Sequence, residues 1–362
     1  KALERLGVSP RAVRRHVAGE DVRDWAAITV DEVFFPYDDL GGILPPEEVG
    51  ANRFLWPART VLGARRTFSG ETYNQAGRPW WGWHQLPTDA DTHPLTLTYA
   101  NVATHNHFAL GDSEAAFNSK AVVIKFTAVS DPDINRILAV VNSSASLFWL
   151  RSVALPKPLV GEEWQRRYEF DATKVGSLPI IQIEGHAKRM AAKISTLAKE
   201  FFASLSPAQA SDCVDLTSCA ANEHRKSLFR EMVMLQEELD WQVYRAHGLV
   251  DVGMLSDETL PAGVDLGERA FEIAMVRGIS SSDENLAWFS RHNSQPITEI
   301  PADWPDEYKN LVQRRIDLIA SDESIAILER PEHKRRWATQ PWERQVERGL
   351  RVWLLDRLED RR

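Results

Sequence analysis

The pattern of apolar residues in this chain changes at the segment His186-Ala-Lys-Arg-Met-Ala-Ala-Lys-Ile-Ser-Thr-Leu-Ala-Lys-Glu-Phe-Phe-Ala-Ser-Leu205. Its apolar residues recur at spacings of three and four, which is typical of an amphipathic helix with one buried face. The same kind of spacing predicts further helices over about 222–247, 306–320 and 341–359. The second part of the chain, 186–362, is therefore predicted to be a mainly helical domain.

The residues before this helix follow a different pattern. Short β-branched and aromatic segments, such as 94–100 and 121–126, are bounded by Gly, Pro, Asn and Asp, as strands usually are. One amphipathic helix interrupts them, over 133–152. We therefore predict an α+β protein in which a strand-rich domain, 1–185, precedes the helical domain, 186–362.

The composition excludes several classes of protein. The chain has 362 residues, of which 43% are hydrophobic and 26% charged; these values exclude a disordered chain, a collagen-like fibre and a disulfide-stapled miniprotein. No run approaches the roughly 18 apolar residues that cross a bilayer, so we expect no membrane partner. Two cysteines, Cys213 and Cys219, suit a reducing cytoplasm. Since Lys1 is not an initiator methionine and no signal peptide follows, we expect a fragment of a longer cytoplasmic protein.

The sequence lacks the common motifs of catalysis and cofactor binding. It contains no GxGxxG, Walker loop, HExxH or GxSxG, and no Asn-Pro-Pro-Tyr-type tetrapeptide or FxGxG-like loop of the amino-methyltransferases. Cys213, Cys219 and His224 have an irregular spacing for zinc ligands, which favours two free thiols over a metal site. We therefore predict no catalytic residue, no metal and no cofactor within this chain.

One segment is positively charged in an acidic chain. The chain has 43 Lys+Arg against 52 Asp+Glu, a net charge of −9, whereas 53–85 holds five arginines and one glutamate, which sum to +4. Arg, Asn and Gln can bind base edges and phosphates, but Arg can equally stack on a tryptophan-rich core. Both interpretations stay open here. On the first, the candidate DNA-binding residues of this segment are Arg53, Arg59, Arg65, Arg66, Arg78, Trp81, His84 and Gln85.

A second candidate group follows in the next strands. Because side chains alternate along a strand, His105 and His107 would point to the same face. The two histidines would then be either a structural pair at a strand end or part of a surface that faces a ligand. With Asn106 and Lys120, we count these two histidines among the DNA-binding candidates.

Two charged stretches of the helical half are predicted to face solvent. Glu237, Glu238 and Asp240 lie in the long helix over 222–247, where acids usually form a solvated face. The basic run His-Lys-Arg-Arg at 333–336 is typical of a solvated helix end.

Several strings resemble known DNA adenine methyltransferases. The segments 19–25 and 137–150 look like parts of the target-recognition regions of type IIG and related enzymes. Longer strings over nearly the whole chain resemble the PglX family of type 2 BREX phage-defence systems. These are Phe54-Leu-Trp-Pro57, Gly70-Glu-Thr-Tyr73, Gly77-Arg-Pro-Trp-Trp-Gly-Trp-His-Gln85, Ala103-Thr-His-Asn-His-Phe108, Leu235-Gln-Glu-Glu-Leu-Asp-Trp-Gln-Val-Tyr244, Gly267-Glu-Arg-Ala-Phe-Glu272 and Arg330-Pro-Glu-His-Lys-Arg-Arg-Trp337.

The resemblance implies both a place for the missing catalytic motifs and a function for this chain. Members of this family are S-adenosylmethionine-dependent DNA adenine-N6 methyltransferases, so the catalytic domain and its S-adenosylmethionine would lie before Lys1. This chain would read double-stranded DNA while that domain flips and methylates adenine. Other BREX proteins and phage-encoded inhibitors are further expected partners.

Two alternatives come from other classes of protein. The chain could be a protein-interaction scaffold for the defence complex, because 186–362 holds 24 basic and 30 acidic residues, a balance of −6. It could also be the specificity region of a type IIG restriction–modification fusion that cleaves DNA as well.

Overall fold

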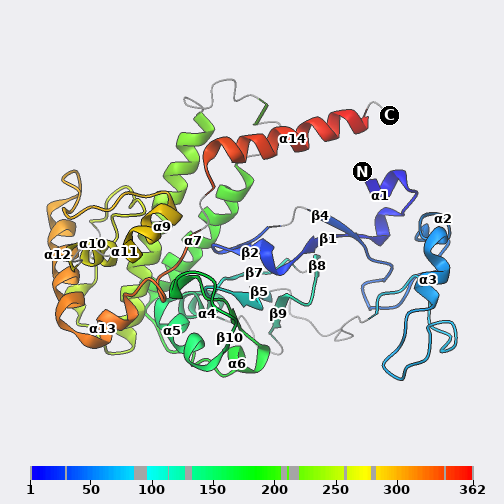
Figure 1. Cartoon of the computed structure of the whole chain (residues 1–362), viewed down its shortest axis with the longest axis horizontal. Coiled ribbons are helices and arrows are strands. Elements are labelled where there is room, and N and C mark those ends of the chain that lie inside the picture. The colour runs from blue at the N-terminus through cyan, green and yellow to red at the C-terminus, as the bar shows by residue number, and fades with distance from the viewer. Residues whose placement is uncertain are drawn as a thin grey trace.

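The computed structural model describes residues 2–28, 31–84, 96–112, 114–126, 133–204, 210–211, 220–256, 259–278, 283–337 and 340–360. Three regions follow one another along the longest axis: a helical body, small sheets in the middle, and the short helices α2 (Ala51–Phe54) and α3 (Arg59–Gly63) at the far end (Figure 1). Helices account for 49% of the residues and strands for 12%, which confirms the predicted α+β class.

The strands are short and form several small sheets. They are β1 (Val13–Val17), β2 (Val22–Arg23), β3 (Ala26–Ala27), β4 (Asp31–Phe34), β5 (Thr96–Ala100), β6 (Val102–Ala103), β7 (Phe108–Leu110), β8 (Ala116–Phe117), β9 (Ala121–Lys125), β10 (Leu155–Pro156) and β11 (Tyr168–Glu169). The sheet orders are β4-β1-β8, β7-β5-β9, β10-β11-β6 and β2-β3. β5 is antiparallel to both of its neighbours, and all five of its residues are buried. The strands predicted at 94–100 and 121–126 are β5 and β9, with residues 94 and 95 outside the described ranges.

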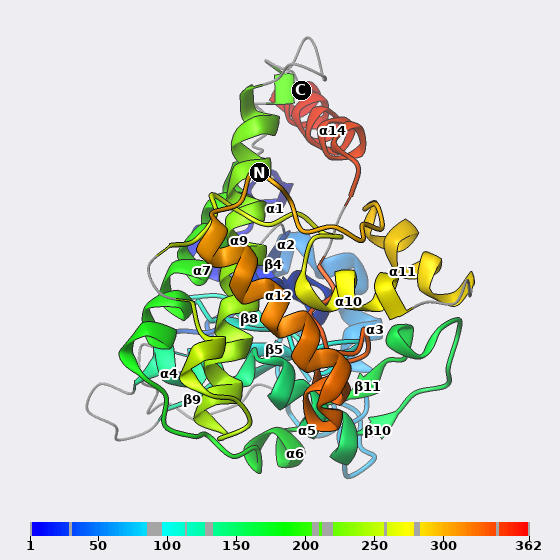
Figure 2. The same cartoon turned by 90° about the vertical axis from the view of Figure 1, so that its left-hand side faces the viewer.

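The long helices lie where periodicity predicted them. Among the described residues of this half the helices are α7 (Gly185–Ala203), α9 (Ala220–Ala246), α10 (Ala270–Gly278), α11 (Asp283–His292), α12 (Asp306–Ser321), α13 (Glu323–Leu328) and α14 (Trp342–Asp360). α7 and α9 pack side by side, and α14 extends away from the body (Figures 1 and 2). Within the described ranges, no helix combines the length and the apolarity needed to cross a bilayer.

The single helix predicted over 133–152 is two helices, α4 (Ile134–Val141) and α5 (Ser144–Val153). The side-chain amide of Asn142 donates to the carbonyl of Leu138 and to that of Phe108 on β7, while the Ser143 hydroxyl caps α5 by accepting from the backbone N–H of Ser146. Side chains that bond nearby backbone groups end a helix even where its apolar spacing continues. The short helices α1 (Ala2–Arg5) and α6 (Ala172–Gly176) complete the strand-rich half.

One hydrophobic core spans both halves of the chain. Trp25, Leu97 and Leu138 of the strand-rich half belong to the same cluster as the apolar residues of α7, α9 and α12. A smaller cluster, separate from this core, consists of Val8, Ala12, Val49 and Ala51, the last of which is the first residue of α2. The position near 185 therefore separates two patterns of secondary structure that share a common core.

The middle of α9 is buried on every side. Each residue from Met232 to Tyr244 is buried, including Glu237, Glu238 and Asp240. The prediction of a solvated face for these three acids is wrong. A helix that is buried all round can carry acids only where cations from other elements pair with them.

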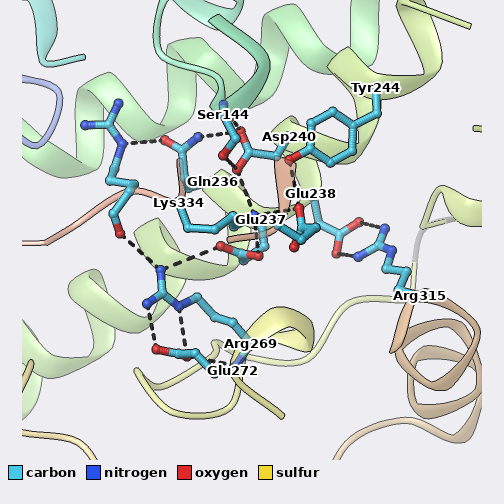
Figure 3. Close-up of polar contacts among 12 residues, drawn as sticks. Ser144, Gln236, Glu237, Glu238, Asp240, Tyr244, Arg269, Glu272, Arg315 and Lys334 are labelled. Atoms are coloured by element: carbon cyan, nitrogen blue, oxygen red, sulfur yellow. Dashed lines mark hydrogen bonds and ion pairs between the residues drawn. The ribbon is translucent and has the colours of Figure 1, made fainter. Parts of the chain in front are cut away.

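The partners of these acids come from distant segments (Figure 3). The guanidinium of Arg315 donates to both oxygens of Glu238, at 2.6 and 2.8 Å. The Lys334 ammonium lies 2.9 Å from Glu237, 3.0 Å from Asp240 and 3.1 Å from Glu329. Lys334 is 0% exposed and Arg335 is 2% exposed, so the prediction that 333–336 is a solvated helix end is wrong for both residues. The nine members of this buried polar cluster are Glu237, Glu238, Asp240, Glu272, Glu329, Arg269, Arg315, Lys334 and Arg335.

The buried polar cluster also joins the two halves of the chain. Asp240 accepts hydrogen bonds from the backbone N–H and the hydroxyl of Ser144 in α5, at 2.9 and 2.6 Å. Gln236 accepts from the indole N–H of Trp25 at 2.8 Å and from Arg335 at 2.9 Å. Since each of these groups is buried, separating the halves would leave several polar atoms without partners.

Candidate nucleic-acid interface

The tryptophans of the positively charged segment anchor it to the strand-rich half. The indole N–H of Trp81 donates to the carbonyl of Leu44 at 3.0 Å, and that of Trp83 donates to the carbonyl of Phe34 in β4 at 2.9 Å. Trp80 is buried, and its ring meets that of Trp81 edge to face. The half-buried Trp81 is thus fixed by its bond to Leu44 and by Trp80, over whose ring the guanidinium of Arg59 lies at 5.8 Å.

One of the five arginines belongs to the interior of this segment. Arg65 is half-buried and donates to three carbonyls, those of Leu62, Trp80 and Gly82, at 2.8–2.9 Å. Its guanidinium also lies 4.4 Å from the centre of the Tyr73 ring. Arg65 therefore holds the turns of the segment together, which is the structural role that the sequence left open.

The other four arginines are exposed. Arg59 lies over the half-exposed ring of Trp56 at 4.6 Å, Arg78 lies 5.7 Å from the Tyr73 ring, and Arg66 donates to the carbonyl of Gly70 at 2.7 Å. Neither these three residues nor Arg53 forms an ion pair within the part of the chain that the structure describes. Exposed guanidiniums without a carboxylate partner can bind phosphates or base edges.

Two aromatic rings complete this surface. His84 is exposed, stacks on Tyr73 and lies 5.1 Å from the ring of Phe68, which is 79% exposed. Phe68 and Trp56 were not among the sequence candidates, although exposed aromatic rings beside arginines can stack on unpaired bases. We call this set the arginine-rich surface: Arg53, Trp56, Arg59, Arg66, Phe68, Arg78 and His84. Gln85 lies outside the described residues.

The remaining candidates lie elsewhere. Lys120 is exposed in the turn between β8 and β9. His105, Asn106 and His107 are buried, at 0%, 2% and 6% exposed. The side-chain amide of Asn106 donates to the carbonyls of Val141 and Ser143, which join α4 to α5. The triplet therefore connects β7 to the helices behind it, and its side chains do not belong to the arginine-rich surface.

The tautomer of His107 is fixed by its neighbours. Its Nδ1 accepts from the backbone N–H of Asp24 at 3.3 Å and from the guanidinium of Arg335 at 3.1 Å, so its proton is on Nε2. Burial first, and the charge of Arg335 second, hold the pKa of His107 well below its ordinary value. Burial likewise lowers the pKa of His292 to about 4.

Acidification should destabilise the fold through these neutral histidines. Below pH about 6.5 the unfolded chain takes up protons that the folded chain does not bind, so the free energy of unfolding falls with pH. For His292 the loss between pH 7 and 5 is about 2 kcal/mol. Protonation of Glu237 has the opposite effect on the free energy of unfolding. Burial raises the pKa of Glu237 to about 7, so as the pH falls the folded state takes up this proton before the unfolded state does.

The measurement compares urea unfolding of the wild type and His292→Asn at pH 7 and pH 5. Asparagine keeps an N–H where Nδ1 of His292 donates to the carbonyl of Trp288. We expect the variant to lose about 2 kcal/mol less than the wild type between the two pH values. Equal losses would show that His292 is not held neutral.

The described residues contain no group of three or more His, Cys, Asp or Glu arranged to hold a metal. His224 is exposed and lies 3.0 Å from Glu200, while Cys213 and Cys219 lie outside the described ranges. What sequence reasoning missed is a pocket in which Arg23, Arg291 and Arg336 converge. No local pattern could have found it, because the three residues are spread over more than 300 positions.

Comparison with known proteins finds a match to a family model at the end of the chain. Residues 232–362 match a family described as a domain of unknown function, DUF7008. All nine members of the buried polar cluster lie within this segment, which begins inside α9. The match therefore covers the part of the helical half that carries the buried charges.

A comparison over the whole chain is more specific. The chain is 40% identical, over its full length, to the adenine-specific methyltransferase PglX of Streptomyces coelicolor. It spans 31% of the length of that relative and fits a C-terminal portion of it. The expected resemblance to PglX is confirmed.

Proposed function

We propose that this chain is the DNA-recognition region of a site-specific adenine-N6 DNA methyltransferase of a BREX phage-defence system. The observation that carries the proposal is the arginine-rich surface, whose exposed guanidiniums have no carboxylate partner among the residues that the structure describes and share this surface with the exposed rings of Trp56 and Phe68. The 40% identity to PglX supports the reaction of the whole enzyme. A part of the enzyme outside this chain would bind S-adenosylmethionine, flip the target base and transfer the methyl group. The whole enzyme would act in the cytoplasm.

The arginines of this surface would contact either base edges or phosphates, depending on their position. A guanidinium that reaches guanine forms two hydrogen bonds to one base edge, which is worth about 1–3 kcal/mol of discrimination at that position. A guanidinium that reaches a phosphate adds affinity for every sequence and makes it depend on salt. The anchored tryptophans would keep both kinds of arginine in fixed places.

Substituting the exposed arginines tests this proposal. We expect Arg66→Ala and Arg78→Ala each to weaken binding of duplex DNA by the 362-residue chain, and to reduce the slope of log K against log salt by about 0.9 for each lost phosphate contact. Lys226→Ala is the matched control, because Lys226 pairs with Glu223 on the surface of α9. Sequencing of methylated sites with the same changes in the whole enzyme would show which positions of the target are relaxed.

The alternative role as a scaffold rests on a different feature. α14 extends from the body and carries exposed leucines at 350, 354, 355 and 358, which are 38–54% exposed. Such a face suits contact with another protein, such as a further BREX component. Absence of duplex binding at low salt, together with unchanged methylation in both arginine variants, would favour this role over DNA recognition.

A further inference from the structure

A pocket of about 420 Å³ lies where the two halves of the chain meet. Arg23 at the end of β2 and His107 before β7 line it from the strand-rich half. Arg291 in the last turn of α11, together with Arg336 and Gln340 between α13 and α14, lines it from the helical half. Three guanidiniums from three separate segments thus face one cavity.

The positive charge of this pocket is poorly compensated. Arg336 is half-buried over the ring of Trp164, at 5.1 Å, and neither it nor Arg291 has an ion-pair partner among the described residues. Arg23 contacts Asp24 only at 3.4 Å. Among the lining residues the carboxylate is that of Glu20, which is exposed to solvent, where its charge is screened. Burial, followed by the charges of Arg291 and Arg23, lowers the pKa of Arg336 to about 10.

Neutral donors accompany the three arginines. His107 carries its proton on Nε2, because its Nδ1 accepts from Asp24 and Arg335, and it remains uncharged at neutral pH. Gln340 adds an exposed side-chain amide. Planar guanidiniums together with neutral N–H donors match the tetrahedral array of acceptor oxygens on a phosphate.

We propose that this pocket binds a phosphate of the DNA backbone. The proposal rests on the proposed function, to which it adds a second contact that is independent of the arginine-rich surface. Bringing like charges together costs free energy, which a phosphodiester in the pocket would offset. The exposed positions of Arg291 and Gln340 leave the pocket accessible to a polymer as well as to a small anion.

The surroundings of the pocket favour the polymer. A Cβ added at Gly19, which lines the pocket, would lie 2.5 Å from the carbonyl of Lys120, so the turn that carries exposed Lys120 packs directly beside it. A further cation beside the pocket can contact the next phosphate along a strand. α11 lies in the helical body, whereas α2 and α3 lie at the other end of the molecule (Figures 1 and 2). A duplex that touches both sites would run along the longest axis.

The experiment measures duplex binding by the 362-residue chain as a function of salt, for Arg291→Ala and Arg336→Met. Each variant should bind about 5–10-fold more weakly at low salt and lose about 0.9 from the slope of log K against log salt. Arg245→Ala is the matched control, because Arg245 is an exposed arginine at the end of α9 outside the pocket. Arg291 is exposed, so its variant should fold even if Arg336→Met does not.

A second arm separates a backbone phosphate from a free anion. Inorganic phosphate is titrated against wild type and Arg291→Ala, and its protection against thermal unfolding is recorded. Protection by phosphate with unchanged duplex binding in both variants would overturn the backbone assignment in favour of a free-anion site. Unchanged behaviour in both arms would overturn the site altogether. If Arg66→Ala and Arg78→Ala weaken duplex binding while the pocket variants do not, the proposed function stands and this inference fails.

Discussion

Replacing Lys334 with methionine should destabilise the fold by about 3–5 kcal/mol. Lys334 is 0% exposed and is the shared partner of Glu237, Asp240 and Glu329. Burial alone would lower its pKa, but the charges of Asp240, Glu237 and Glu329 raise it, so the ammonium stays charged. Methionine fills a similar volume and leaves these carboxylates without their cation. Urea unfolding at pH 7 measures the loss.

The loss caused by Lys334→Met should become smaller in acid. Without the ammonium, the negative charges of these buried acids are no longer compensated, so neutralising them with acid should cost the variant less stability than it costs the wild type. Lys226→Met is the control, since Lys226 pairs with Glu223 at the exposed surface and should cost less than about 1 kcal/mol. A variant as stable as this control at pH 7 would show that the three acids are not charged in the native protein.

Arg315→Met should have an effect of similar size for a simpler reason. Arg315 and Glu238 are each 1% exposed and share two hydrogen bonds, and the hydroxyl of Tyr308 donates to the same carboxylate at 2.8 Å. Removing the guanidinium leaves a buried charge with one neutral donor, at a cost of about 3–5 kcal/mol. Unfolding by urea reports this cost directly.

The double variant Arg315→Met with Glu238→Gln decides whether that cost is electrostatic. Glutamine keeps an acceptor for Tyr308 and removes the charge, so it should restore at least about half of the lost stability. A double variant no more stable than Arg315→Met would mean that the loss comes from packing around Trp241, over which the guanidinium lies at 4.8 Å.

Local periodicity was sufficient for the long helices α7, α9, α12 and α14, because the apolar residues of each recur with the period of a helix. The same argument failed over 133–152, where Asn142 and Ser143 form side-chain bonds that end one helix and begin the next. It failed again at Glu237, Glu238 and Asp240. Acids in a helix normally face water, and the cations that pair with these three acids lie 32 to 97 residues further along the chain.

Some features of the candidate interface also follow from the local sequence, whereas others depend on distant residues. The net charge of 53–85 is a local property, so composition alone located the arginine-rich surface. Which arginine is structural is not local, since Arg65 is defined by the carbonyls of Trp80 and Gly82, 15 and 17 residues away. The pocket of Arg23, Arg291 and Arg336 exists only in the folded chain, where Trp337 after α13 joins the shared core and Trp288 and Phe289 of α11 pack with Trp164 of the strand-rich half.

The small cluster of Val8, Ala12, Val49 and Ala51 has a consequence for engineering new target specificity. Because this cluster is separate from the large core, a chimera that exchanges the segment 31–84 should leave that core intact if Val8, Ala12 and strand β1, which pairs with β4, are transferred with it. A chimera joined near 185 would instead cut through the contacts of Trp25 and Ser144 with α9. Domain shuffling in this family should therefore succeed at the outer segment and fail at the boundary between strands and helices.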